Sequence, residues 1–322
     1  MRLLASILVL LTSGQIAAAA DPIELHVRPV PLDTRAPEQR RVGSLEFLAG
    51  FDLIGLDRRW GGYSSMILSD SGDHLLAVSD FGHWARLELT HDAAGRLTGF
   101  GAAVLGDLTG PDGRKLGSKF AGDAEALAAA PDGGLLVAFE REHRIWRYDG
   151  GDAPFEGAPS AFPAPKAIVA LPENGGIESL VTLPDGRLLA IAEGEEDGDD
   201  IIPGWLLQDD RWEPLGWTRV RPYRPTDAAA LPDGDVIVLE RRFSLIGGPG
   251  ARLSMIEAEA IVPGATLFGT PVAELRLPHS VDNFEGIAAR RGPGGETLIY
   301  ILSDDNRSDF QRTLLLQFRW TR

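Results

Sequence analysis

The sequence predicts an all-β protein and, within that class, a β-propeller of four-stranded blades. Three observations support this prediction. Short apolar runs recur along the chain, and a glycine-containing turn joins each pair of runs. The repeats open about 50 to 60 residues apart, which is the length of one propeller blade. Five repeats are readable, so we expect five or six blades.

Each repeat reads as a hairpin that ends in an acid. The five hairpins are GGYSSMILSDSGDHLLAVSDF, DAEALAAAPDGGLLVAFER, GIESLVTLPDGRLLAIAEG, TDAAALPDGDVIVLERRF and NFEGIAARRGPGGETLIYILSDD. Glycine in the turn supplies the positive φ that a tight hairpin needs. The flanking runs are short and lack a helical period, which indicates strands.

Further strands complete each blade. A third strand is expected in residues 83–90, 143–150, 204–210, 251–261 and 313–320, and fourth strands in 97–105 and 271–278. The early segment VGSLEFLAGFDL resembles a fourth strand that precedes a repeat. We therefore expect it to close the ring against the last blade.

The N-terminal residues predict export. Residues 1–20 combine one basic residue, an apolar run too short to span a bilayer, and an alanine-rich end, as in a cleaved secretory signal peptide. We expect residues 21–42 to form an N-terminal extension and residues 43–322 a single propeller domain. The predicted location is periplasmic or secreted, without membrane insertion. No cysteine is present, so core burial or metal ions must stabilise the fold.

The charge of the chain restricts its partners. The formal net charge is −16 at pH 7. Such a surface repels nucleic acid and anionic membranes, so we expect no nucleic-acid partner. A small anionic or ester substrate and a monomeric state are the remaining expectations.

Acids recur at two positions of the repeat. Aligning the hairpins places one set at the start of the first strand: Ser64, Glu125, Glu178, Asp227 and Glu285. A second set stands at the end of the second strand: Asp80, Glu140, Glu193, Glu240 and Asp304. The start of one hairpin strand and the end of its partner share an edge. Both sets are therefore expected at one mouth of the central channel.

Converging carboxylates raise one another's pKa, and a hard cation relieves the repulsion. Calcium accepts six to eight oxygens in flexible geometry, so Ca²⁺ is the expected ion, and another divalent cation is the alternative. The predicted metal ligands are Glu125, Glu178, Asp227 and Glu285. In the alternative interpretation these acids cap turns or pair with Arg141, Arg241 and Arg242.

Other side chains near the predicted mouth suggest roles in catalysis and binding. Glu140, Glu240 and His143 are candidates for a general base. Arg141 and Arg241 are candidates for holding an anionic substrate, and Ser64 is a further candidate substrate contact.

The segments DAEAL, GIESL, ALPDGDVIVLERRFS and NFEGIA…LSDDN resemble the phytase-like family, also called "esterase-like activity of phytase". The likeness runs from Gly43 to Trp320. It implies a secreted bacterial propeller with hydrolase activity on phosphate or carboxyl esters. A more distant likeness connects the acids at the inner-strand starts to calcium-dependent lactonases of the gluconolactonase and paraoxonase type. Those enzymes use Glu, Asn and Asp around one ion, and this sequence departs from them because it has no asparagine at these positions.

Two functions from different classes follow. The first is a metal-dependent hydrolase of phosphoric or carboxylic esters. The second is a non-enzymatic periplasmic binding or scaffold propeller with a structural cation, whose recognition face would consist of surface tryptophans: Trp84, Trp205, Trp212 and Trp217.

Overall fold

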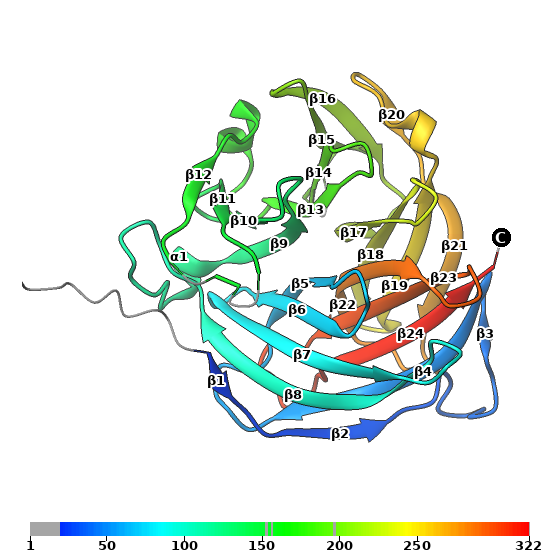
Figure 1. Cartoon of the computed structure of the whole chain (residues 1–322). Coiled ribbons are helices and arrows are strands. Elements are labelled where there is room, and N and C mark those ends of the chain that lie inside the picture. The colour runs from blue at the N-terminus through cyan, green and yellow to red at the C-terminus, as the bar shows by residue number, and fades with distance from the viewer. Residues whose placement is uncertain (1–19, 152–153, 156, 196–197, 322) are drawn as a thin grey trace, which may run out of the picture.

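The fold is a five-bladed β-propeller, as predicted. A computed structural model describes residues 20–151, 154–155, 157–195 and 198–321, so the predicted signal peptide lies outside the described residues except for Ala20. Figure 1 shows five antiparallel sheets arranged around a common axis. Within the described ranges, no helix has the length and apolar character to cross a bilayer.

The first three blades follow one another along the chain. Blade 1 contains β5 (Tyr63–Leu68), β6 (His74–Ser79), β7 (His83–His91) and β8 (Leu97–Asp107), with β1 (Asp21–Pro22) at its outer edge. Blade 2 contains β9 (Ala124–Ala129), β10 (Leu135–Phe139), β11 (Arg144–Tyr148) and β12 (Ser160–Phe162). Blade 3 contains β13 (Ile177–Thr182), β14 (Leu188–Ala192), β15 (Ile201–Gln208) and β16 (Arg211–Thr218), with β20 (Thr266–Leu267) beside β16.

The last two blades complete the ring. Blade 4 contains β17 (Arg224–Ala230), β18 (Val236–Ser244), β19 (Gly248–Ile256) and β21 (Thr270–Arg276). Blade 5 contains β22 (Asn283–Arg291), β23 (Thr297–Asp304), β24 (Leu314–Trp320) and β4 (Leu45–Gly55), with β2 (Leu25–Pro29) and β3 (Arg41–Val42) paired to β4. Helical turns are short: α1 (Lys119–Gly122), η1 (Lys166–Ala170) and η2 (Ala258–Ala260).

An early strand closes the ring, as the sequence predicted. Strand β4 pairs antiparallel with β24, from Leu45 opposite Trp320 to Asp52 opposite Leu314. The first and last parts of the chain thus share one sheet, which leaves no open edge between the blades. The N-terminal residues also join the fold, since β1 pairs with β8 and β2 pairs with β4.

The inner strand of each blade lines the axis. Strands β5, β9, β13, β17 and β22 contact one another in that order, and β22 contacts β5 again. The core lies between neighbouring blades, where second strands rich in leucine, isoleucine and valine are fully buried. Burial of these β-branched and leucine side chains stabilises the stacking of blade on blade.

The tryptophans do not form the proposed recognition face. Trp84, Trp205 and Trp217 are only 2%, 5% and 1% exposed because they pack between blades. Trp212 is half-buried, and its indole N–H donates to the carbonyl oxygen of Pro163. The expected recognition face is therefore wrong for three of its four members.

Candidate metal centre

A β-bulge opens the inner strand of every blade. In each hairpin one residue is skipped in the pairing between the first and second strands: Ser64, Glu125, Glu178, Thr226 and Glu285. A bulge bends the strand and redirects the extra side chain. Four of the five skipped residues line a hollow at the mouth of the channel, and the exception is Thr226.

The second strand supplies the next layer of this hollow. In each blade, the second strand pairs with the residue just before the bulge, and the next residue along the second strand lines the same hollow. These residues are Asp80, Glu140, Glu193, Arg241 and Asp304. The expected convergence on one mouth therefore holds for four blades. In blade 4 a threonine and an arginine occupy the two positions where blades 2, 3 and 5 carry acids.

The placement predicted for Asp227 and Glu240 at the mouth is wrong by one residue. Asp227 follows the bulge, and Glu240 is paired opposite Pro225 before it. A shift of one residue along a strand turns a side chain to the opposite face. The proline of each PDG turn gives the correct register. The bulge residue stands six positions before this proline, as in Glu125, Glu178 and Thr226. The second-strand residue stands nine positions after it, as in Glu140, Glu193 and Arg241.

Asp227 bridges three blades below the mouth. Its side chain is 1% exposed and accepts hydrogen bonds from Ser65 Oγ at 3.1 Å and from the backbone N–H groups of Ile287 at 2.9 Å and Ala228 at 2.8 Å. Burial raises the pKa of Asp227 well above its usual value, although these donors oppose the shift. Asp227 does not line the mouth hollow, and its hydrogen bonds tie neighbouring blades together.

Glu240 is enclosed within blade 4. It is fully buried, accepts a hydrogen bond from Ser254 Oγ at 2.8 Å and lies 3.6 Å from Arg252 Nε. Burial raises the pKa of Glu240. Because the carboxylate does not line the mouth hollow, it cannot reach a substrate there.

The mouth hollow is small and strongly acidic. Its volume is about 250 Å³. Among the described residues, seven carboxylates line it: Asp80, Glu125, Glu140, Glu178, Glu193, Glu285 and Asp304. Three cations also line it: Lys119, Arg141 and Arg241. Negative charge therefore exceeds positive charge within the hollow.

Cations form ion pairs with three of the carboxylates that line the hollow. Arg241 lies 3.2 Å from both Glu193 and Glu285. Arg224 adds a second contact to Glu193 at 3.1 Å, and Lys119 lies 2.6 Å from Asp80. For Glu193 and Glu285 the alternative interpretation from the sequence, pairing with arginine, describes the contacts, whereas Asp80 pairs with a lysine.

The Arg141 guanidinium pairs with an acid that the sequence analysis did not single out. Asp123 is fully buried beside the hollow, and Arg141 Nε lies 2.5 Å from its Oδ2. Its Oδ1 has no hydrogen-bond donor in the described part of the chain. The signal was present in the sequence, because Asp123 precedes Glu125 by two residues in the segment DAEAL.

Glu125 and Glu178 have no direct partner in the described ranges. They are only 9% and 6% exposed, and in the described ranges neither has a hydrogen-bond donor or an ion-pair partner. Oxygens of Asp123, Glu125 and Glu140 lie within 4.8 Å of one another, as do oxygens of Glu140, Glu178 and Glu193. This set of buried carboxylate oxygens fits a hard divalent cation.

Burial and mutual repulsion raise the pKa values of several carboxyl groups in the hollow. Burial, together with Glu178 and other nearby acids, raises the pKa of Glu125 well above its usual value, and burial with Glu193 and other acids does the same for Glu178. Burial raises the pKa of Glu140 to about 7 and that of Asp304 to about 9. A bound cation would return these groups to the ionised form.

The remaining predicted residues divide between the hollow and its surroundings. Ser64, Glu140, Arg141 and Arg241 line the hollow. His143 does not line the hollow, and its Nε2 contacts the carbonyl oxygen of Pro172 at 2.9 Å. Glu140 is anchored by the backbone N–H of Gly176, which donates to its Oε1 at 3.2 Å.

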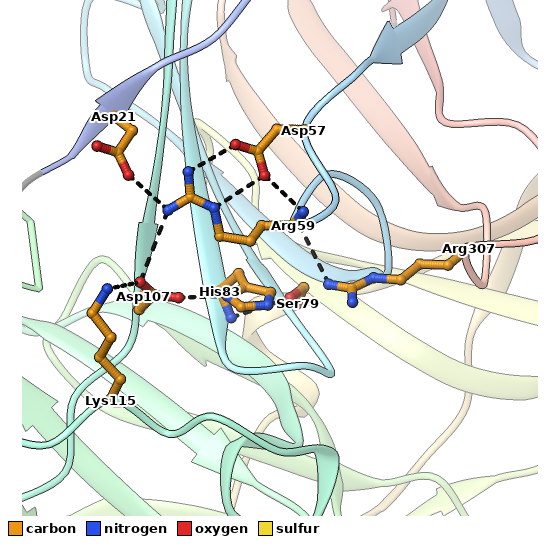
Figure 2. Close-up of polar contacts among 8 residues, drawn as sticks. All are labelled: Asp21, Asp57, Arg59, Ser79, His83, Asp107, Lys115 and Arg307. Carbon is orange, nitrogen blue, oxygen red and sulfur yellow. Dashed lines mark hydrogen bonds and ion pairs between the residues drawn. The ribbon is translucent and has the colours of Figure 1, made fainter.

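A polar network fastens the N-terminal strand beside blade 1 (Figure 2). Arg59 joins Asp21 of β1 to Asp57 at 2.8 Å each and approaches Asp107 at 3.9 Å. Asp107 also contacts Lys115 at 2.5 Å and His83 Nδ1 at 2.9 Å. The hydrogen bond to His83, with Lys115 nearby, holds the pKa of Asp107 well below its usual range.

Ser79, His83 and Asp107 are the residue types of a hydrolytic triad, but their geometry differs from one. Ser79 is fully buried, and its Oγ accepts from the backbone N–H of His83 at 3.2 Å rather than contacting the ring (Figure 2). A nucleophilic serine needs a ring nitrogen as its base. This network is therefore structural.

Three solved structures resemble the chain at low identity. A protein provisionally named a gluconolactonase is 15% identical, with a TM-score of 0.45, over 96% of this chain and 93% of that one. The α-L-arabinofuranosidase of Podospora anserina, in complex with cellotriose, is 10% identical, with a TM-score of 0.46, over 87% and 98%. Virginiamycin B lyase from Staphylococcus aureus is 10% identical, with a TM-score of 0.40, over 92% and 100%. Likeness at this level says nothing about activity.

Sequence comparison is more informative about the family. No curated protein matches the chain at a significant level. Residues 58–307 match the phytase-like family, described as "Esterase-like activity of phytase". The match covers well over half of the chain and includes the bulged hairpins that build the mouth hollow, so the resemblance noted from the sequence is confirmed. The chain belongs to the phytase-like family.

Proposed function

We propose that this protein is an exported hydrolase of phosphoric or carboxylic esters that uses a calcium ion at the channel mouth. The observation that carries the proposal is the pair Glu125 and Glu178, which are buried and form no hydrogen bond or ion pair in the described part of the chain, while Lys119 and Arg241 act on them only from a distance. Membership of the phytase-like family supports the reaction class.

The cation would be held by the unpaired carboxylates. Glu125 and Glu178 would supply ligands from neighbouring blades. Glu140 has an oxygen close to each of them, and Asp123 and Glu193 each offer a further oxygen within 4.8 Å of these groups. Calcium suits this site because it accepts several carboxylate oxygens without demanding strict geometry. When bound, such an ion polarises a phosphoryl or carbonyl oxygen and acidifies water.

The chain's own residues would complete the chemistry. We assign Glu140 as the general base, because it lines the hollow and the Gly176 N–H holds one of its oxygens in place. Lys119 and Arg141 line the rim of the same hollow and offer positive charge to an anionic substrate. Ser64 offers a hydroxyl from blade 1. Glu240 and His143, which lie outside the hollow, receive no role.

The setting of this activity follows from the N-terminal residues. Residues 1–20 have the pattern of a cleaved signal peptide, which supports a periplasmic or secreted enzyme. A monomer that acts on a small ester, without nucleic acid and without membrane insertion, is consistent with the net charge of −16.

Hydrolysis of 4-nitrophenyl acetate and 4-nitrophenyl phosphate, measured in EDTA and then in calcium, tests the proposal. We expect hydrolysis in calcium, its loss in EDTA, and a fall of about two orders of magnitude in Glu125→Gln/Glu178→Gln. The matched control is Glu257→Gln/Glu259→Gln, which changes two exposed glutamates around η2 and should leave the rate unchanged. If neither ester is hydrolysed with calcium, magnesium or zinc, a binding propeller with a structural cation replaces the hydrolase.

A further inference from the structure

A second hollow adjoins the mouth hollow, and we call it the side hollow. It has a volume of about 860 Å³ and shares Arg241, Glu285 and Asn306 with the mouth hollow. Its lining comes from the β18–β19 hairpin of blade 4, from the start of β22 with the residues before it, and from the β23–β24 loop of blade 5. This volume lies within the range of pockets that hold small organic ligands.

Two phenylalanines from different blades line the side hollow. Phe243 comes from the blade 4 hairpin and is 69% exposed, and Phe310 comes from the blade 5 loop and is 96% exposed. The hairpin tip beside Phe243 adds Leu245 and Ile246, also almost fully exposed. Apolar side chains gathered in this way beside a site indicate a contact surface for an apolar group.

One arginine in the side hollow lacks an acidic partner. Arg241 pairs with Glu193 and Glu285, and Arg312 lies 3.4 Å from Asp282. Arg242 instead contacts the hydroxyl oxygens of Tyr223 at 3.2 Å and Ser244 at 3.5 Å, and it forms no ion pair within the described ranges. Its charge is therefore available to an anionic group.

We propose that the side hollow binds the apolar part of an amphipathic ester, with Phe243 and Phe310 on either side of it and Arg242 on an anionic group. This inference rests on the proposed function, because it places the scissile ester bond next to the carboxylates of the mouth hollow. The substrate class is a singly charged aryl or alkyl ester.

Fluorescence titration with a matched pair of dyes tests the binding half of the proposal. The anionic dye is 8-anilinonaphthalene-1-sulfonate, and N-phenyl-1-naphthylamine has the same rings without the charge. In the full protein with calcium, Phe243→Ala/Phe310→Ala should raise both Kd values by about tenfold. Arg242→Gln should weaken the anionic dye by about tenfold and leave the neutral dye unchanged.

The control is Phe268→Ala, which removes a phenylalanine that is 59% exposed and lies outside the side hollow. It should change neither Kd. Equal affinities of the wild type and Phe243→Ala/Phe310→Ala for both dyes would overturn the inference. So would an Arg242→Gln effect of the same size on the two dyes, because the charge would then have no specific role.

A hydrolysis series separates this inference from the proposed function. The kcat/KM for 4-nitrophenyl butyrate relative to 4-nitrophenyl acetate should fall in Phe243→Ala/Phe310→Ala. If calcium-dependent hydrolysis is present but this ratio is unchanged, the side hollow is not the substrate pocket and the hydrolase proposal stands. If the dyes bind as predicted and no ester is hydrolysed, the binding site stands and the hydrolase proposal is overturned.

Discussion

Replacing Asp227 with alanine should destabilise the propeller without changing its response to calcium. The Asp227 carboxylate accepts hydrogen bonds from Ser65 Oγ, Ala228 N–H and Ile287 N–H, and thereby ties blade 4 to blades 1 and 5. Alanine itself is compatible with the position, because Ala126 follows the bulge in blade 2 at the equivalent place. The loss of stability in Asp227→Ala therefore reports the loss of the carboxylate acceptor alone.

The magnitude follows from the three donors that lose their acceptor. Each unsatisfied buried donor costs about 1–3 kcal/mol, and water that enters the vacated volume recovers part of this cost. We expect a total of roughly 3–6 kcal/mol. For a domain of this size class, about 1 kcal/mol lowers Tm by roughly 2–4 °C, so Asp227→Ala should melt at least about 6 °C below the wild type.

The assay is a thermal melt of the wild type and Asp227→Ala in EDTA and in saturating calcium. Both proteins should show the same calcium-induced rise in Tm, because Asp227 lies outside the mouth hollow. An Asp227→Ala variant that melts like the wild type in EDTA but ignores calcium would refute this reasoning and restore Asp227 as a metal ligand.

Two further predictions concern the charges of the mouth hollow. In EDTA, the protein should melt at a lower temperature at about pH 7.5 than at about pH 5.5. The reason is that Glu140, with a pKa of about 7, and Asp304, with a pKa of about 9, keep protons in the folded state that the unfolded chain has already lost. Equal Tm values at the two pH values would contradict this prediction. Arg241→Gln removes the cation shared by Glu193 and Glu285. In thermal melts this variant should have a lower Tm than the wild type in EDTA, and calcium should raise its Tm by more than it raises that of the wild type. A calcium-induced rise in Tm no larger than that of the wild type would count against the charge argument.

The fold could be predicted from the sequence because each blade repeats its own local signals. Glycine turns between short apolar runs specify hairpins, and five such hairpins at blade spacing specify the propeller. The closing strand was also predictable, since the segment that became β4 resembles the fourth strand of the other blades. These signals are local, so one sequence is enough to detect them.

The site was predicted less completely, and the bulges explain why. One extra residue in each inner strand decides which side chain faces the channel, and the hydrophobic pattern does not show where that residue is. In blade 4 the acids Asp227 and Glu240 happen to stand one residue from the positions that matter. Counting from the turn proline would have selected Thr226 and Arg241 instead.

Other parts of the site depend on contacts between distant segments. Lys119 reaches Asp80 from the loop between blades 1 and 2, and the side hollow forms where Phe243 and Phe310 approach from two blades. No spacing along the sequence encodes these approaches. They follow only after the ring is closed.

The most direct test of the central claim is a thermal melt in EDTA and in graded calcium, for the wild type and for Glu125→Gln/Glu178→Gln. At a hundredfold excess over Kd, a ligand specific for the folded state adds about 2.7 kcal/mol, so wild-type Tm should rise by several degrees. The double variant should melt higher than the wild type in EDTA, because two buried like charges are removed, and should not respond to calcium. A wild-type Tm that ignores calcium, magnesium and zinc alike would contradict a cation site at the channel mouth.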